Sequence, residues 1–464
     1  SSLTNIAISL SLHRQNEKRG ITMNRYILTG GTILTFDKDK PLLEQQAILI
    51  DDGYIVKIGA DDFFQDEMCE RIDVEGKIIM PGLINAHHHF YSTFVTGLGK
   101  SAPAKNFNAV LENLWWRLDK KLLPEDNYYS ALISILASIR KGTTTIIDHH
   151  SSPYAVENSL SQIAKAVRET GIKASLCYEV SDRDGAKIAK EGIEENYHWI
   201  KNCQNNPNPF LKGLFGLHAA FTLSDITLAN IADKVAELNC GIHIHTAEAE
   251  TDEKYNVEHF GRRVMERLND FNLLNSKSIL AHSVYLNARE LILAEEKGAA
   301  IVTNPQSNLN NAVGIADVCK MMELGITVGL GTDAMTNNML EEVRVGVWAQ
   351  HLKQNDPSRG FMEIASALVF NNPIIAQKYW GEKHGTIKEG SPADIIVVDY
   401  IPYTPFNEET WMGHLVYGIS QANIDATICQ GKILMWNGEL LLDIDEQEVK
   451  AKARELAKKL WDRF

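Results

Sequence analysis

Three consecutive histidines end one short apolar stretch of the chain, in a spacing that suits metal binding. Residues Pro81–Phe90 read Pro-Gly-Leu-Ile-Asn-Ala-His-His-His-Phe, an apolar strand that runs directly into the histidines. Side chains alternate between the two faces of a strand, so His87 and His89 point to one side and His88 to the other. Imidazole is the commonest metal ligand in proteins. This stretch alone fits a surface cluster of histidines equally well, so the other candidate ligands must decide.

The elements that must position these histidines can be read from the alternation of apolar strands and helical patterns after residue 81. We expect eight strands, at residues 83–89, 143–148, 173–180, 213–219, 241–246, 278–282, 299–303 and 327–333. This repeated alternation favours a closed (β/α)₈ TIM-like barrel over an open sheet. A doubly wound sheet is the alternative, but no Gly-x-Gly-x-x-Gly motif follows any of these strands.

Metal-competent side chains end four of the expected strands. His87 and His89 end the first, His245 the fifth, His282 the sixth and Asp333 the eighth. In a barrel, the carboxyl ends of the strands form the catalytic face, so these residues should converge. Each alone is more often structural, but the set favours a metal site. Imidazoles and a carboxylate with a position open for water suit hydrolysis, because a bound divalent ion lowers the pKa of its water from about 15.7 to about 7.

Glu248 follows His245 by three residues and lies just beyond the end of the same expected strand. A carboxylate at this place could carry protons between the attacking water and a nitrogen of the substrate. The alternative is a solvent-exposed loop acid, because Glu250, Asp252 and Glu253 follow closely. Imidazole and carboxylate ligands suit zinc first, although iron and manganese accept the same donors.

Composition excludes several classes of function. The chain has 464 residues and a net charge of −14, without a basic patch, which argues against a nucleic-acid partner. No apolar run is long enough to span a membrane. Six cysteines without a Cys-x-x-Cys pair indicate a reducing compartment and argue against a thiolate zinc site. We therefore expect a cytoplasmic enzyme with a small-molecule substrate, and a homodimer by default.

The distribution of strand-like and helical segments along the chain predicts its domains. Short β-rich runs occupy residues 23–80 and return at 385–440, so both chain ends should build one small β-sandwich around the barrel of residues 81–384. Residues 441–464 carry the apolar spacing of a C-terminal helix. Residues 1–22 are expected to be a non-native or disordered extension, because Met23 looks like a natural start and the early charges follow the apolar patch, unlike those of a secretory signal.

These motifs resemble the amidohydrolase superfamily, specifically its aminohydrolase and chlorohydrolase branch, which deaminates purines, pyrimidines and triazines. The matching segments are Pro81–Phe90, His245–Glu248, Ala281–His282, Gly331–Asp333, Gly385–Ile387 and Gly390–Asp394. Asn113–Asp119 and Asp148–Pro153 further resemble the aminohydrolases associated with selenium metabolism, and the Asp-His-His stretch also resembles 8-oxoguanine deaminases.

The resemblance implies a role for each matching residue. It implies one divalent metal held by His87, His89, His245 and Asp333, with Asp333 also acting as general base. It further implies Glu248 as the proton shuttle and His282 as the group that orients the attacking oxygen or polarises the substrate. No lysine ends the fourth strand, so a carbamate bridging two metals is not expected.

The residues around this set are expected to contact substrate or to support the ligands. His218, at the end of the fourth strand, matches a position that contacts substrate in relatives. One of His149 and His150 is expected to line the same pocket. His88 should face the barrel wall. His243 lies one layer below His245, and the sequence leaves open whether it supports the metal ligands.

We therefore predict a metal-dependent aminohydrolase that releases ammonia from a small nitrogen heterocycle, purine-like before pyrimidine-like. Nucleoside-acting relatives carry a ribose-binding glutamate that has no clear equivalent at residues 117–120, which favours a free base. One alternative is a chlorohydrolase or alkylamine hydrolase acting on a triazine-like ring. Another is a non-catalytic protein on a hydrolase scaffold, but the presence of every expected ligand favours the enzyme.

Overall fold

Eight parallel strands form the centre of the molecule. The computed structural model describes residues 24–464, and the extension expected at residues 1–22 lies outside them. The barrel strands are β8 (Leu83–His88), β9 (Thr143–Asp148), β10 (Lys173–Leu176), β12 (Phe215–Ala219), β13 (Ile242–Thr246), β14 (Ile279–His282), β15 (Ala300–Thr303) and β16 (Val328–Leu330), with the short β11 (Leu211–Gly213) beside β10. Parallel bridges at Val180–Leu217 and His88–Asp333 join the two runs of strands. The ring is closed, which confirms the (β/α)₈ barrel.

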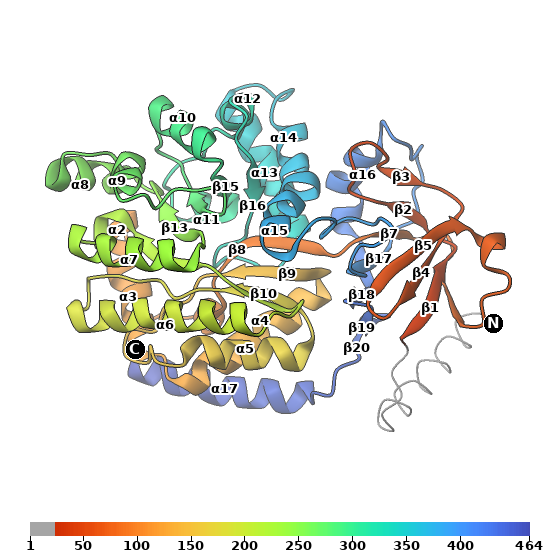
Figure 1. Ribbon diagram of the computed structural model, residues 1–464, viewed down its shortest axis with the longest axis horizontal. Coiled ribbons are helices and arrows are strands. Elements are labelled where there is room, and N and C mark those ends of the chain that lie inside the picture. The colour runs from red at the N-terminus through yellow and green to blue at the C-terminus, as the bar shows by residue number, and fades with distance from the viewer. Residues whose placement is uncertain (1–23) are drawn as a thin grey trace.

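Helices surround the barrel (Figure 1). The principal ones are α4 (Pro124–Arg140), α5 (Ser159–Thr170), α6 (Ala186–Asn205), α7 (Asp225–Leu238), α10 (Ala288–Lys297), α12 (Val318–Glu323), α13 (Met339–Gln354), α14 (Phe361–Ser366) and α15 (Asn372–Trp380). Shorter helices on the loops are α2 (Phe107–Val110), α3 (Trp116–Leu118), α8 (Glu250–Phe260), α9 (Val264–Asp270), α11 (Pro305–Asn310) and α16 (Trp411–Tyr417). The C-terminal α17 (Glu446–Arg463) packs on α4, which fits the expected helix at the chain end. No helix in residues 24–464 combines the length and apolarity that a membrane crossing requires.

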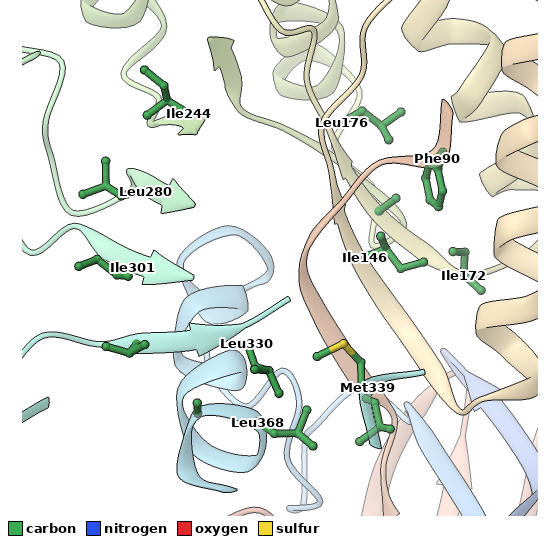
Figure 2. Close-up of a cluster of buried hydrophobic side chains, with 14 of the residues drawn as sticks. Phe90, Ile146, Ile172, Leu176, Ile244, Leu280, Ile301, Leu330, Met339 and Leu368 are labelled. Carbon is green, nitrogen blue, oxygen red and sulfur yellow. The ribbon is translucent and has the colours of Figure 1, made fainter. Parts of the chain in front are cut away.

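Apolar side chains hold the strands against the helices. Ile244, Leu280, Ile301 and Leu330 lie on four successive strands, β13 to β16, and Leu368 packs into the same cluster (Figure 2). All five are essentially inaccessible to solvent. Burying each such side chain contributes roughly 1.5–3 kcal/mol, so this core fixes the strands firmly. The polar strand ends can therefore gather at one rim without being needed for packing.

A second unit combines both ends of the chain, at the right of Figure 1. One sheet has the order β5–β4–β1–β6 and the other β20–β19–β18–β17–β7–β2–β3. Their strands are β1 (Arg25–Thr29), β2 (Thr32–Leu34), β3 (Leu42–Leu43), β4 (Gln46–Asp51), β5 (Tyr54–Ala60), β6 (Glu70–Asp73), β7 (Ile78–Pro81), β17 (Ile395–Asp399), β18 (Asn423–Cys429), β19 (Lys432–Trp436) and β20 (Glu439–Leu440). Strand β17 pairs with β7, so this β-sandwich is built from both chain ends, as expected. The domain boundaries assigned by residue number stay a prediction.

A buried ion pair links the β-sandwich to the barrel. Lys173 begins β10, and its Nζ lies 2.7 Å from Oδ2 of Asp394, which directly precedes β17. Both side chains are almost completely buried, at 1% and 2% exposure. Burial alone would raise the pKa of Asp394, but Lys173, His384 and the hydrogen bond from Gln430 together outweigh burial and lower that pKa. The backbone nitrogen of Gln430 donates to Oδ1 of Asp394 at 2.8 Å, so both carboxylate oxygens are occupied.

We expect Asp394→Asn to lower the melting temperature by roughly 3–5 °C, because it leaves the Lys173 ammonium buried without a counter-charge at a cost of about 3–5 kcal/mol. The contribution of Asp394 is present above its ordinary pKa of 3.8 and is lost as pH falls through the lower folded value. Wild type and variant should therefore converge on acidification. Thermal unfolding followed by circular dichroism at several pH values measures this.

Asp462→Asn is the matched control, because Lys458 and Asp462 form an ion pair with side chains 79% and 60% exposed. Its melting temperature should stay close to that of wild type. Equal shifts in the two variants would contradict a special role for the buried pair.

Candidate active site

The ends of β8, β13 and β16 bring four candidate metal ligands to one point. Asp333 Oδ1 lies 2.8 Å from Nε2 of His89 and 3.4 Å from Nε2 of His87. Nε2 of His245 lies 3.2 Å from Nε2 of His89. Four ligand atoms at these distances from one another could all bind one ion placed between them.

The opposite ring nitrogens of two of these histidines are held by the protein. Nδ1 of His89 donates to the carbonyl oxygen of His149 at 2.6 Å, so in the neutral ring Nε2 carries the lone pair that a metal would need. Nδ1 of His87 lies 2.8 Å from Nε2 of His243, which gives His243 a supporting place below the cluster. Within residues 24–464, the fully buried Nε2 of His87 has no hydrogen-bond partner. A buried lone pair without a partner fits a metal ligand, and such outer hydrogen bonds fix ring orientation.

Asp333 is held at the rim of the barrel by two hydrogen bonds. Its backbone nitrogen donates to the carbonyl oxygen of His87 at 2.9 Å. The Ser307 hydroxyl, from α11, donates to its Oδ2. Burial would raise the pKa of Asp333, but the neighbouring His89 and His87 outweigh it and hold that pKa well below the usual range. The carboxylate is therefore anionic and oriented.

Glu248 and His282 lie beside the cluster and face each other. Oε2 of Glu248 is 3.4 Å from Nε2 of His282. Nδ2 of Asn308 donates to Nδ1 of His282 at 2.9 Å, which places the proton of the neutral ring on Nε2. Burial lowers the pKa of His282 to about 3, whereas burial and Asp333 raise that of Glu248 well above its usual range. Glu248 is 8% exposed, so it is not a solvent-exposed loop acid.

The cavity next to these residues is lined by both polar and apolar side chains. His218 and Glu179 lie among its lining residues, together with the metal-ligand candidates and Glu248. Aromatic and apolar side chains from the segment between β8 and α4, among them Tyr91, Phe107 and Trp116, complete the lining. Such a mixture suits a flat heterocycle with a few polar edge atoms.

The structure places His149 and His150 outside this lining, unlike the expectation for one of them. His149 lies behind Glu179, with Nδ1 2.9 Å from Oε2. Nε2 of His150 lies 2.8 Å from the hydroxyl of Ser152. His88 faces the wall as expected, with Nε2 2.8 Å from the hydroxyl of Ser134 on α4. The geometry therefore favours indirect roles for these three histidines.

Sequence reasoning missed three residues of this region, Glu179, Ser307 and Asn308. Glu179 falls within the expected third strand at residues 173–180, although the regular part of β10 ends at Leu176. An acidic residue near the end of an apolar barrel strand could have identified Glu179 as a candidate site residue. Ser307 and Asn308 lie on α11, directly after β15, and no pattern in the sequence distinguishes them from other loop residues.

Comparisons with known proteins agree with this geometry. The family model described as "Amidohydrolase family" matches residues 78–434. A 5-methylthioadenosine/S-adenosylhomocysteine deaminase of Syntrophomonas wolfei subsp. wolfei is 30% identical over 445 residues, covering 94% of this chain and 99% of the relative. A 5'-deoxyadenosine deaminase of Methanosarcina mazei is 29% identical over 444 residues, covering 94% and 98%. The crystal structure of an adenosine deaminase from Xanthomonas campestris with bound zinc has a TM-score of 0.83 at 22% identity, covering 94% and 98%.

We expect the purified protein to hold one equivalent of a divalent metal, and His89→Ala to lose it, because Nε2 of His89 lies against two of the other three ligand candidates. Metal analysis by inductively coupled plasma mass spectrometry measures this directly. His198→Ala is the control, since that side chain lies on α6, is 72% exposed and is not one of the ligand candidates. Two full equivalents in the wild type would overturn the single-ion site.

Proposed function

This chain belongs to the amidohydrolase family and is a hydrolase of carbon–nitrogen bonds, and we propose that it deaminates a purine-like heterocycle with one divalent metal. The observation that carries the proposal is the placement of Glu248 and His282 at the edge of the ligand cluster, facing each other at 3.4 Å. The relatives named above are deaminases, which supports the reaction. The narrower resemblance to aminohydrolases associated with selenium metabolism stays a prediction.

His87, His89, His245 and Asp333 would hold the ion, and zinc is our first choice because it suits imidazole and carboxylate donors. When bound, such an ion supplies Lewis acidity and a water of lowered pKa. The zinc in the Xanthomonas campestris structure supports the choice. These assignments of individual ligands are part of the proposal.

The protein's own residues would move the protons. Glu248 would protonate the ring nitrogen next to the amino-bearing carbon, where negative charge develops during attack. His282 would donate from Nε2 to the attacking oxygen, since Asn308 occupies its Nδ1. Asp333 would take one proton from the attacking water and pass it to the leaving amine, which departs as ammonia. The second proton of that water would return to Glu248 as the product carbonyl forms. Each transfer stays within one buried group of side chains.

We propose a free heterocyclic base as substrate, with His218 at its polar edge and Trp116 against its ring. A nucleoside is the second candidate, favoured by the relatives, which are named as deaminases of 5-methylthioadenosine, S-adenosylhomocysteine and 5'-deoxyadenosine. A homodimer and a cytoplasmic location stay predictions.

Glu248→Gln should keep its metal and its melting temperature yet lose roughly 10²–10⁴-fold in turnover, because glutamine cannot transfer the proton. The assay is ammonia release, screened first across purines, pyrimidines, pterins and triazines with the wild type. Glu250→Gln is the control, since Glu250 is 60% exposed at the start of the next helix.

Two outcomes would count against this mechanism or this reaction. A fully active Glu248→Gln beside a dead His282→Ala would show that the proton takes another route. Release of chloride or alkylamine from every active compound, and never ammonia, would refute the deaminase and favour the chlorohydrolase alternative.

A further inference from the structure

Glu179 is a buried carboxylate in the substrate cavity that the proposed proton transfers do not use. It is 4% exposed and lines the cavity together with His218, on the side formed by the strand ends of β10 and β12. Its Oε2 lies 2.9 Å from Nδ1 of His149. Its Oε1 lies 3.9 Å from Nε2 of His218, and in residues 24–464 it makes no hydrogen bond. This oxygen is free to meet a substrate.

The hydrogen bonds of His149 show whether Oε1 of Glu179 can donate or accept a hydrogen bond. Nε2 of His149 lies 3.0 Å from two carbonyl oxygens, those of Leu217 and His243. Carbonyl oxygens only accept, so Nε2 carries a hydrogen. One further proton then lies between Nδ1 of His149 and Oε2 of Glu179, whichever of the two atoms holds it. Oε1 keeps its lone pairs in either case and can only accept.

The same bonding excludes a second metal at this place. Ligand atoms of His89, His149, Glu179 and His245 lie within 4.8 Å of one another, which resembles a cation site. Both ring nitrogens of His149 are already occupied, however, by Glu179 on one side and by the two carbonyl oxygens on the other. His149 therefore has no lone pair left for an ion, and it acts by holding Glu179.

His218 presents a second acceptor to the same space. The Thr222 hydroxyl donates to the carbonyl oxygen of Ala219 at 3.1 Å, so its oxygen accepts from Nδ1 of His218 at 2.8 Å. In the neutral ring this leaves Nε2 without a hydrogen and with a free lone pair. Two acceptor atoms, 3.9 Å apart, thus face one cavity without a donor between them.

We propose that Glu179 and His218 select substrates whose facing edge carries ring N–H donors. This inference rests on the proposed function and narrows its substrate class to free bases with an imidazole N–H. A sugar or methyl group on the facing nitrogen removes the donor and leaves buried acceptors unpaired. Loss of such a hydrogen bond lowers affinity by about 10- to 100-fold.

The ring of Trp116 lies beside His218 and is held in place by its own contacts. Its centroid lies 6.0 Å from that of His218. The guanidinium of Arg183 lies 5.2 Å above the Trp116 ring and pairs with the buried Asp119. Trp116 is therefore held from behind, and a heterocycle beside it would present its edge to the two acceptors.

Binding of compounds without an exocyclic amino group tests this inference separately from deamination. Xanthine, 7-methylxanthine and 9-methylxanthine are the probes, and titration calorimetry with the zinc-loaded enzyme gives each Kd. Wild type should bind xanthine about 10- to 100-fold more tightly than the derivative methylated at the facing nitrogen. Equal affinity for all three in the wild type would overturn the inference, whatever the ammonia screen finds.

Three variants separate hydrogen bonding from the bulk of the methyl group. Glu179→Leu should lose the preference for xanthine while keeping its zinc and its affinity for the methylated probe. Glu179→Gln should keep most of the preference, because its amide nitrogen can donate to Nδ1 of His149 and its oxygen replaces Oε1. Glu191→Gln, on the exposed face of α6, is the control.

The variants also give outcomes against the inference. A preference that survives in Glu179→Leu would mean that the pocket excludes the methyl group by shape alone. Glutamine and leucine variants that lose the preference equally would show that the acceptor at Oε1 is not the determinant. If Glu179→Leu does not fold, the Kd values of the three probes for the wild type and for Glu179→Gln still test the inference.

Discussion

Buried nitrogen and oxygen atoms without hydrogen-bond partners are costly, at roughly 1–3 kcal/mol each, and this protein gathers several of them at one point. Nε2 of His87 and Nε2 of His282 are both buried without a partner in the described part of the chain. Each ring is fixed from behind, by His243 and Asn308 respectively. The surrounding barrel holds these two atoms in place although neither makes a hydrogen bond in the described part of the chain. An ion and a substrate are what would satisfy them.

Much of the fold and of this site could be predicted from the periodicity of strands. Alternation of faces put His87 and His89 together, and the rule that barrel strands end at one rim brought in His245, His282 and Asp333. Hydrogen-bond roles could not be predicted in this way. His149 looked like a pocket residue because its type and position suited the role, yet its two nitrogens are occupied by Glu179 and by carbonyl oxygens. Only the three-dimensional neighbours decide that.

Contacts between distant parts of the chain were similarly out of reach. The β-rich texture of both ends predicted one shared domain, but not the pairing of Met80 with Ile396 or the ion pair between Lys173 and Asp394. Gly82 connects β7 of the sandwich to β8 of the barrel, and the chain is tightly packed at this position. A Cβ at this glycine would lie 2.1 Å from the Thr144 hydroxyl oxygen of the next strand. Close packing against Thr144 therefore requires a glycine at position 82.

The strand ends that carry the chemistry share an unusual backbone. Ala247, His282 and Asp333 have φ values of 44°, 73° and 51°, in the left-handed region that side chains other than glycine rarely adopt. Such residues cost on the order of 1–3 kcal/mol each and persist only where the surroundings fix them. Here each one ends or follows a strand that carries apolar residues of the buried core. The turn directs the side chain of His282 or Asp333 into the cluster, so the strain and the function have the same cause.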